Sequence, residues 1–177
     1  PDAATREAAC ALPGRPAVVS LAPRTLEDMF ANVLELGRLT HREAEATSLV
    51  SDLRRRVDRV RERTASAERT PRVSLLEWLD PLYACGHWTP ELVSFAGGRE
   101  GHAEPGAASR VLGWEEVLAW RPEVMVVACC GLDTAETSRL FPLLASRPGF
   151  TELPCVADSR VFAVDGHHRR AVGPHGQ

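Results

Sequence analysis

The stretch Glu77–Trp88, EWLDPLYACGHW, gathers side chains that could carry chemistry, including two of the four tryptophans and the only tyrosine of the chain. Flat rings bury a large area at low cost in side-chain entropy and keep a polar edge. Trp78, Tyr83 and Trp88 therefore suit the faces of a broad, mostly apolar ligand. His87 could hydrogen-bond the rim of such a ligand or coordinate its metal. The stretch predicts a small-molecule binding site.

Simpler interpretations exist for the same side chains. Trp78 directly follows a predicted strand, so it could fill the core as well as face a ligand. A loop histidine commonly bonds backbone groups, which would account for His87 without a ligand. Asp80 precedes a proline, where an aspartate often satisfies the backbone of a turn, although its carboxylate could also meet a polar ligand group. The loop positions of Tyr83 and Trp88 favour a ligand.

An enzyme is the alternative from another class, with Cys85 as nucleophile and His87 as base. Such a pair also needs an orienting acid and an oxyanion hole. No GxSxG elbow, P-loop or GxGxxG fingerprint occurs, and no recognisable spacing positions an acid. We therefore expect Cys85 to fill space in a loop, and the chain not to be an enzyme.

Composition narrows the class of protein. The 177 residues suit one medium domain or slightly more, with 44% hydrophobic and 25% charged residues. A net charge of −3 leaves no basic excess for nucleic acid. No apolar run reaches the ~20 residues of a membrane span. The chain begins at Pro1 and shows no signal peptide, so the compartment stays open.

The five cysteines form no CxxC pair, which disfavours a disulfide scaffold or a thiolate zinc site. Cys129 and Cys130 follow an apolar run and are expected to end a buried strand. Residues 167–177 lack apolar periodicity and are expected to be disordered. The histidines of this tail, His167, His168 and His175, have no converging acids or thiols, so we expect no metal site there.

The elements that must position the candidate site begin with a predicted buried strand at 16–21. Thr25 with Asp28 predicts the start of a helix that Gly37 ends. Thr40 with Glu43 predicts a second capping box, from which an apolar stripe runs to about Arg63 as one long helix.

After a polar boundary, the pattern predicts a strand at 72–78, which leads into the aromatic stretch. A short helix starts at Thr89-Pro90 and ends at Gly97. Further elements follow as a helix at 114–120 with a buried Trp114 or Trp120, a strand at 123–128, a helix at 134–145 interrupted near Pro142, and a strand at 160–166. Strands alternating with helices indicate an α/β fold with a mainly parallel sheet.

In this order, the segments PAVVSLAPRTLEDMFANVLELGRLTHREAEATSLVSDLRRRV, RVSLLEWLDPLYACGHWTPELVSFAGG, GWEEVLAWRPEVMVV and FTELPCVADSRVFAVDG resemble periplasmic binding proteins of the cobalamin and siderophore type, most nearly the cobalamin-binding-protein-like branch. The resemblance covers Pro16 to about Gly166. It implies a class III fold, in which two α/β lobes are joined by a long rigid helix. It assigns 1–39 to a remnant of the first lobe, 40–66 to the bridging helix and 70–166 to the second lobe. Most of a first lobe and a C-terminal helix are then missing.

The resemblance also implies a function. It predicts binding of a cobalamin-like corrinoid between the lobes, with a ferric siderophore or haem as alternatives, no further cofactor, and an extracytoplasmic location. The implied ligand-binding residues are Trp78, Asp80, Tyr83, His87 and Trp88. Members dock on the permease of an ABC importer through acidic residues, and Glu91 and Glu100 are the candidates here. A chain without a complete first lobe could also bind nothing on its own.

Overall fold

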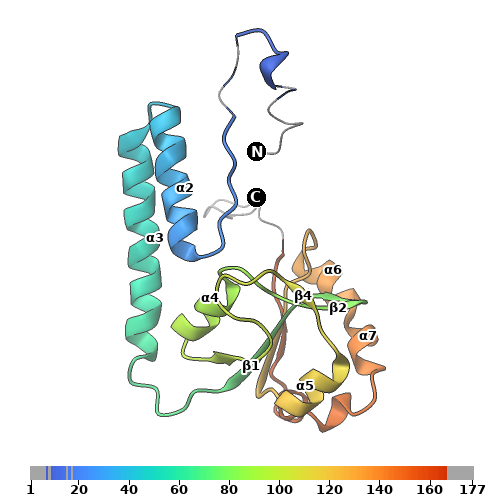
Figure 1. Ribbon diagram of the computed structural model, residues 1–177. Coiled ribbons are helices and arrows are strands. Elements are labelled where there is room, and N and C mark those ends of the chain that lie inside the picture. Colours follow the sequence, from blue (N-terminus) through green and yellow to red (C-terminus); the bar gives the residue numbers. More distant parts are fainter. Residues whose placement is uncertain (1–6, 8, 15, 17, 167–177) are drawn as a thin grey trace, which may run out of the picture.

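A computed structural model describes residues 7, 9–14, 16 and 18–166 of the chain. The tail 167–177, expected to be disordered, and its histidines lie outside the described residues. Two helices, α2 (Leu26–Leu39) and α3 (Glu43–Thr64), form an antiparallel pair that projects from a small α/β lobe (Figure 1). The α2 helix begins with the predicted capping box: the Thr25 hydroxyl accepts the Asp28 N–H at 3.1 Å, and the Asp28 carboxylate accepts the Thr25 N–H at 3.0 Å.

The predicted long helix is confirmed, because α3 runs unbroken over 22 residues. Its predicted start is wrong. Arg42 precedes the helix without a side-chain cap, whereas Thr40 ends α2 and donates its hydroxyl to the Leu36 carbonyl at 2.7 Å. The Thr40 side chain is thus used by the preceding helix, so no capping box forms with Glu43.

Gly37 does not end α2, contrary to the sequence prediction, but lies buried within it. A Cβ atom at this position would lie only 2.4 Å from the Cβ of Ala46 on α3. The absence of a side chain at Gly37 therefore allows the two helices to approach each other closely.

The lobe contains a six-stranded sheet in which β1 (Arg72–Leu79) lies at the centre and pairs in parallel with β5 (Val124–Val127), which in turn pairs in parallel with β6 (Val161–Ala163). A hairpin adds β2 antiparallel to β1, β4 pairs antiparallel with β2, and β3 pairs in parallel with the beginning of β1. The bounds are β1 Arg72–Leu79, β2 Leu82–Ala84, β3 Arg99–Glu100, β4 Arg110–Val111, β5 Val124–Val127 and β6 Val161–Ala163. The mainly parallel α/β sheet predicted from the sequence is confirmed.

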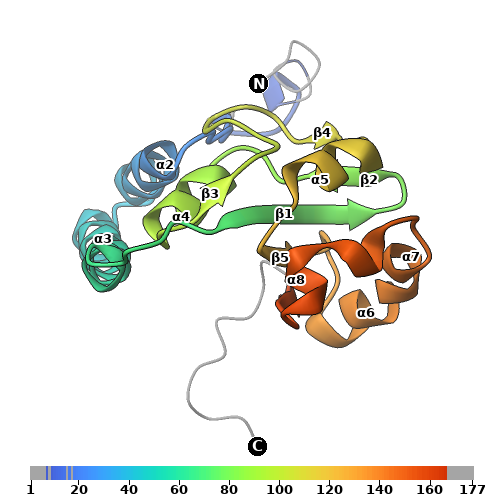
Figure 2. The ribbon, with the colours of Figure 1, turned by 90° about the horizontal axis from the view of Figure 1, so that it is seen from below.

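The helices of the lobe are α4 Thr89–Phe95, α5 Trp114–Trp120, α6 Thr134–Arg139, α7 Phe141–Ala145 and α8 Pro154–Ala157, with a 3-10 turn at Phe150–Glu152. Seen from below, α2 and α3 lie beside α4, and α6, α7 and α8 lie at the opposite side of the lobe (Figure 2). The main core joins the sheet to α5, α7 and α8, and includes Leu76, Met125 and Leu144, each fully buried. Trp114 is part of this core, as expected for one of the two tryptophans of α5. The predicted break near Pro142 separates α6 from α7.

The strand predicted at 16–21 is wrong. Residues 18–21 are not paired with any strand, and Val19 and Leu21 remain 41% and 44% exposed. A strand needs a neighbouring strand for its backbone hydrogen bonds, and the described residues offer none beside this segment. The assignment of 1–39 to a first lobe stays a prediction.

Candidate functional site

The hairpin of β1 and β2 carries an aromatic row on its outer face. Trp78 lies opposite Tyr83 across the hairpin, and Tyr83 lies opposite Val111 of β4. Residues directly opposite each other in antiparallel strands project on the same face, so the three side chains form one row. Trp78 is 36% exposed, Tyr83 is half-buried and Val111 is 56% exposed. We name these three residues the aromatic row.

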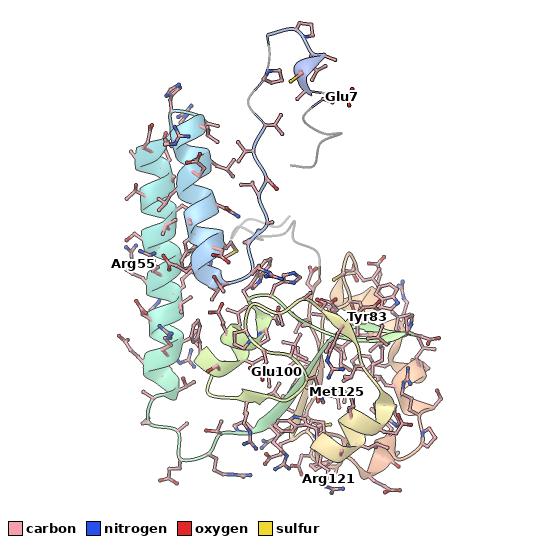
Figure 3. The ribbon with its side chains drawn as sticks, in the orientation of Figure 1. Glu7, Arg55, Tyr83, Glu100, Arg121 and Met125 are labelled. Atoms are coloured by element: carbon pink, nitrogen blue, oxygen red, sulfur yellow. The ribbon has the colours of Figure 1, made fainter. Side chains whose placement is uncertain are left out.

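The flanking pairs explain why the row faces outward. On either side of it, Leu76 pairs with Ala84 and Leu79 pairs with Leu82, and all four side chains are buried. A bulge between Leu76 and Trp78 places one extra residue, Glu77, in β1. The hairpin thus turns its aliphatic side chains into the core and leaves both rings accessible. Tyr83 is half-buried, whereas Met125 is fully buried in the core (Figure 3).

The turn of the hairpin fixes the Trp78 ring. Its indole Nε1 donates to the Asp80 carbonyl at 3.0 Å, and the Asp80–Pro81 peptide bond is cis. Asp80 is exposed, so its carboxylate can reach a ligand beside the ring. Trp78, Asp80 and Tyr83 are therefore brought together, as the sequence suggested.

Two loops meet at the carboxyl end of β2. The backbone N–H of His87 donates to the Ala107 carbonyl at 2.6 Å, and that of Gly106 donates to the His87 carbonyl at 2.9 Å. A Cβ at Gly86 would lie 2.4 Å from the Ser109 nitrogen, so only glycine allows this approach. The contact holds His87 at a positive φ of 56° with its ring half-buried. His87 is thereby fixed in position beside Trp88, with ring centroids 5.9 Å apart.

Glu77 connects these loops to the sheet. Its carboxylate accepts the Ser109 hydroxyl at 2.9 Å, and the Ser109 oxygen accepts the Gly86 N–H at 3.1 Å. The Glu77 carbonyl accepts the Cys130 N–H at 3.2 Å, which adds the end of β5 to the same edge. Sequence reasoning missed Ser109, because a serine in a Gly-rich loop carries no signal of its distant partner.

Trp88 lies elsewhere. Its ring packs against the apolar cluster of α2 and α3, which contains Leu26, Phe30 and Val50. The structure thus separates Trp88 from the aromatic row, contrary to the expectation that both line one surface. The reason is that Trp88 immediately precedes α4, the helix that packs against α3. A ligand contact for Trp88 stays a prediction.

The two acidic docking candidates differ in their surroundings. Glu91 accepts the Leu26 N–H at 2.8 Å and so connects α4 to the first residue of α2. Glu100 turns inward, where its carboxylate accepts the His102 and Ala103 N–H groups at 2.5 and 2.7 Å. Burial raises the pKa of Glu100 above its ordinary value, and its second oxygen is buried without a hydrogen-bond partner. Neither environment tests docking on a permease, but that of Glu100 leaves little carboxylate surface for it.

The Cys85 thiol is buried, with 5% of the residue exposed. Burial, and then the negative charge of Glu77, raise the pKa of this thiol far above its ordinary value. A nucleophilic cysteine needs the opposite shift. The five cysteines are free thiols, and the described residues contain no group of three histidine, cysteine or acidic side chains that could hold a metal ion. Within the same residues, no helix combines the length and apolarity needed to cross a membrane.

Residues 6–167 match a family model described as periplasmic binding protein. The chain belongs to the periplasmic binding protein family. Membership agrees with the resemblance drawn from the sequence and identifies a family of binding proteins rather than of enzymes. No curated protein matches the chain closely enough to add to this assignment.

Solved structures of this family show the same fold. An ABC transporter substrate-binding protein from Listeria monocytogenes EGD-e matches with a TM-score of 0.72 and 20% identity, over 84% of this chain and 58% of that one. S. aureus IsdE complexed with heme matches with a TM-score of 0.70 and 18% identity, over 80% of this chain and 56% of that one. A structure from the ABC-type Fe3+-hydroxamate transport system of Saccharomonospora viridis DSM 43017 matches with a TM-score of 0.64 and 23% identity, over 85% of this chain and 51% of that one. The chain thus spans little more than half the length of these relatives.

Proposed function

We propose that this chain forms the ligand-facing second lobe and bridging helix of a substrate-binding protein that delivers an iron chelate, either haem or a ferric hydroxamate siderophore, to an ABC importer. The observation that carries this proposal is the aromatic row, in which Trp78 and Tyr83 stand side by side and accessible in a member of the periplasmic binding protein family. Such a family member acts outside the cytoplasm, which is the location we propose.

The choice of ligand class rests on chemistry and on the relatives. Two adjacent rings offer a broad apolar surface, and the neighbouring Asp80 carboxylate offers a polar contact at its edge. This surface suits corrins, haem and siderophore chelates alike. The names of the similar structures mention iron, heme and Fe3+-hydroxamate. These names favour haem or a ferric siderophore over cobalamin as the ligand. Cobalamin is therefore included as the third ligand in the binding test.

Titration of the 177-residue chain with haemin, a ferric hydroxamate siderophore and cyanocobalamin, followed by tryptophan fluorescence, tests the proposal. We expect weak binding, because a ligand held between two lobes loses about half of its contacts when one is absent, while the cost of association hardly changes. A dissociation constant of roughly 0.01–1 mM is expected for one iron chelate. Failure of both iron chelates to bind below about 1 mM would contradict the proposal, and binding of cyanocobalamin alone would restore the corrinoid.

Single substitutions can show whether the chelate binds at the aromatic row. Tyr83→Ala should weaken binding by roughly 5- to 100-fold, the range for losing an aromatic anchor in an interface. Phe162→Ala is the matched control, because this ring is 50% exposed on β6 and lies outside the aromatic row. His87→Ala should change the visible spectrum of bound haem only if the imidazole coordinates the iron. Equal losses in Tyr83→Ala and Phe162→Ala would mean that the chelate merely adheres to exposed aromatic rings.

A further inference from the structure

A cavity of about 560 Å³ lies between α2, α3 and α4, away from the aromatic row. Much of its lining is apolar. The three helices contribute Met29 and Phe30, Val57 and Val60, and Leu92 and Phe95, and the Trp88 ring lies beside them. Val60 and Leu92 are each 41% exposed, so part of this surface faces solvent. The volume is within the range of pockets that hold small organic molecules.

Three arginines of α3 line the same cavity. Arg56, Arg59 and Arg63 are three and four residues apart, so they project along one face of the helix. None of them forms an ion pair with any described residue, and no acidic residue lines this cavity. Their neighbours differ: Arg54 pairs with Glu27, and Arg55 pairs with Asp52.

This arrangement is unfavourable without a partner. Like charges three or four residues apart on a helix repel one another, which Asp52 and Glu62, at the same spacing from Arg56 and Arg59, offset only in part. The adjacent apolar side chains are also left partly exposed to water. A molecule with an apolar body and an anionic head would relieve both costs, because its body would cover Trp88 and Leu92 while its head would accept hydrogen bonds from the guanidinium groups.

We propose that this cavity binds an amphiphilic organic carboxylate, with its carboxylate on Arg56, Arg59 and Arg63 and its apolar part against α2 and α4. The site is separate from the aromatic row, and its existence does not depend on which chelate that row binds. Arginine suits the head group because its planar guanidinium matches a carboxylate in a bidentate contact.

The test uses a matched pair of fluorescent probes, 1-pyrenebutyrate and the uncharged 1-pyrenebutanol, with energy transfer from tryptophan as the signal. We expect the carboxylate to bind about tenfold more tightly than the alcohol, because several partly exposed charge contacts each add a small gain in affinity. Raising the ionic strength should reduce this preference. Equal affinities of the two probes would overturn the proposal.

Substitutions on α3 test whether the carboxylate of the probe binds at these arginines. The triple variant Arg56→Gln, Arg59→Gln, Arg63→Gln should remove the preference for the carboxylate and leave the alcohol unchanged. Arg55→Gln is the control, because it removes one charge from the same helix, at a residue that does not line this cavity (Figure 3). A preference that survives the triple variant, or that Arg55→Gln reduces as strongly, would place the anion elsewhere and refute the proposal.

Val60→Glu gives an independent result. Its carboxylate would lie four residues after Arg56 and three before Arg63, where it can pair with both. We expect this variant to unfold at a higher urea concentration than the wild type and to lose pyrenebutyrate binding. If the probe does not bind and the wild-type chain instead forms dimers that Val60→Glu disrupts, the cavity is an interface with a second copy and the proposal fails.

Discussion

The buried imidazole of His102 makes the stability of the lobe depend on pH. Its Nε2 lies 2.7 Å from the Ser74 hydroxyl, and the Trp120 ring meets it edge-on, with ring centroids 6.2 Å apart. Only 5% of the residue is exposed. Burial first, and then the positive charge of Arg110, lower the pKa of His102 from 6.5 to about 4.

The sign of the effect follows from which state binds more protons. Between pH 6.5 and about 4 the unfolded chain has a protonated histidine while the folded chain keeps it neutral. The free energy of unfolding contributed by His102 is therefore complete above pH 6.5 and is lost as the pH falls toward 4. At about 1.4 kcal/mol per pKa unit the whole shift is worth roughly 3 kcal/mol, and solvent screening reduces the expected loss to about 1–2 kcal/mol.

Urea denaturation of the wild type and of His102→Gln, followed by tryptophan fluorescence from about pH 7 to about pH 4.5, measures this loss. Glutamine keeps a polar contact to Ser74 but does not titrate. The comparison is needed because Glu100, whose pKa burial raises, acts in the opposite direction and stabilises the folded state as the pH falls. The wild type should lose about 1–2 kcal/mol more than the variant over this range. Parallel curves for the two proteins would show that His102 is not kept neutral by burial, and would refute the reasoning.

Two further predictions concern the helix pair and the cysteines. Gly37→Ala should lower the free energy of unfolding by about 1–3 kcal/mol through its clash with Ala46, and Ala46→Gly in the same chain should recover part of the loss in urea denaturation; a Gly37→Ala protein as stable as the wild type would contradict the close helix contact. Iodoacetamide near neutral pH should modify the exposed Cys10 but leave Cys85 largely unmodified in the folded chain, as measured by mass spectrometry of peptides. Fast labelling of Cys85 would instead support a role as nucleophile.

Local signals in the sequence predicted those elements whose cause is also local. The Thr25 capping box and the apolar stripe of α3 act within a few residues, and both elements were confirmed. The strand predicted at 16–21 was wrong because its pattern requires a partner strand that the described residues do not supply. The capping box predicted at Thr40 was wrong because two helices compete for one hydroxyl, and periodicity does not show which of them obtains it.

The residues of the candidate site also differ in whether local sequence or long-range packing determines their position. Trp78 and Tyr83 could be placed together because a short hairpin fixes which residues face each other. The position of Trp88 depends on how α4 packs against α2 and α3, a contact between segments far apart in the sequence. The cavity lined by the three arginines of α3 likewise has no signal in the sequence, because it depends on the packing of α4 beside α2 and α3.

The helix pair is mounted on the lobe through both ends of α4. At one end, Glu91 accepts the Leu26 N–H at 2.8 Å; at the other, the Thr64 hydroxyl donates to the Phe95 carbonyl at 3.0 Å. The Arg61 guanidinium lies 3.7 Å from the centre of the Phe95 ring, which adds a third support. Because these contacts hold α4 to α2 at one end and to α3 at the other, and because the chain after Thr64 leads directly into β1, we expect a displacement of the helix pair to move α4 and the start of β1 with it.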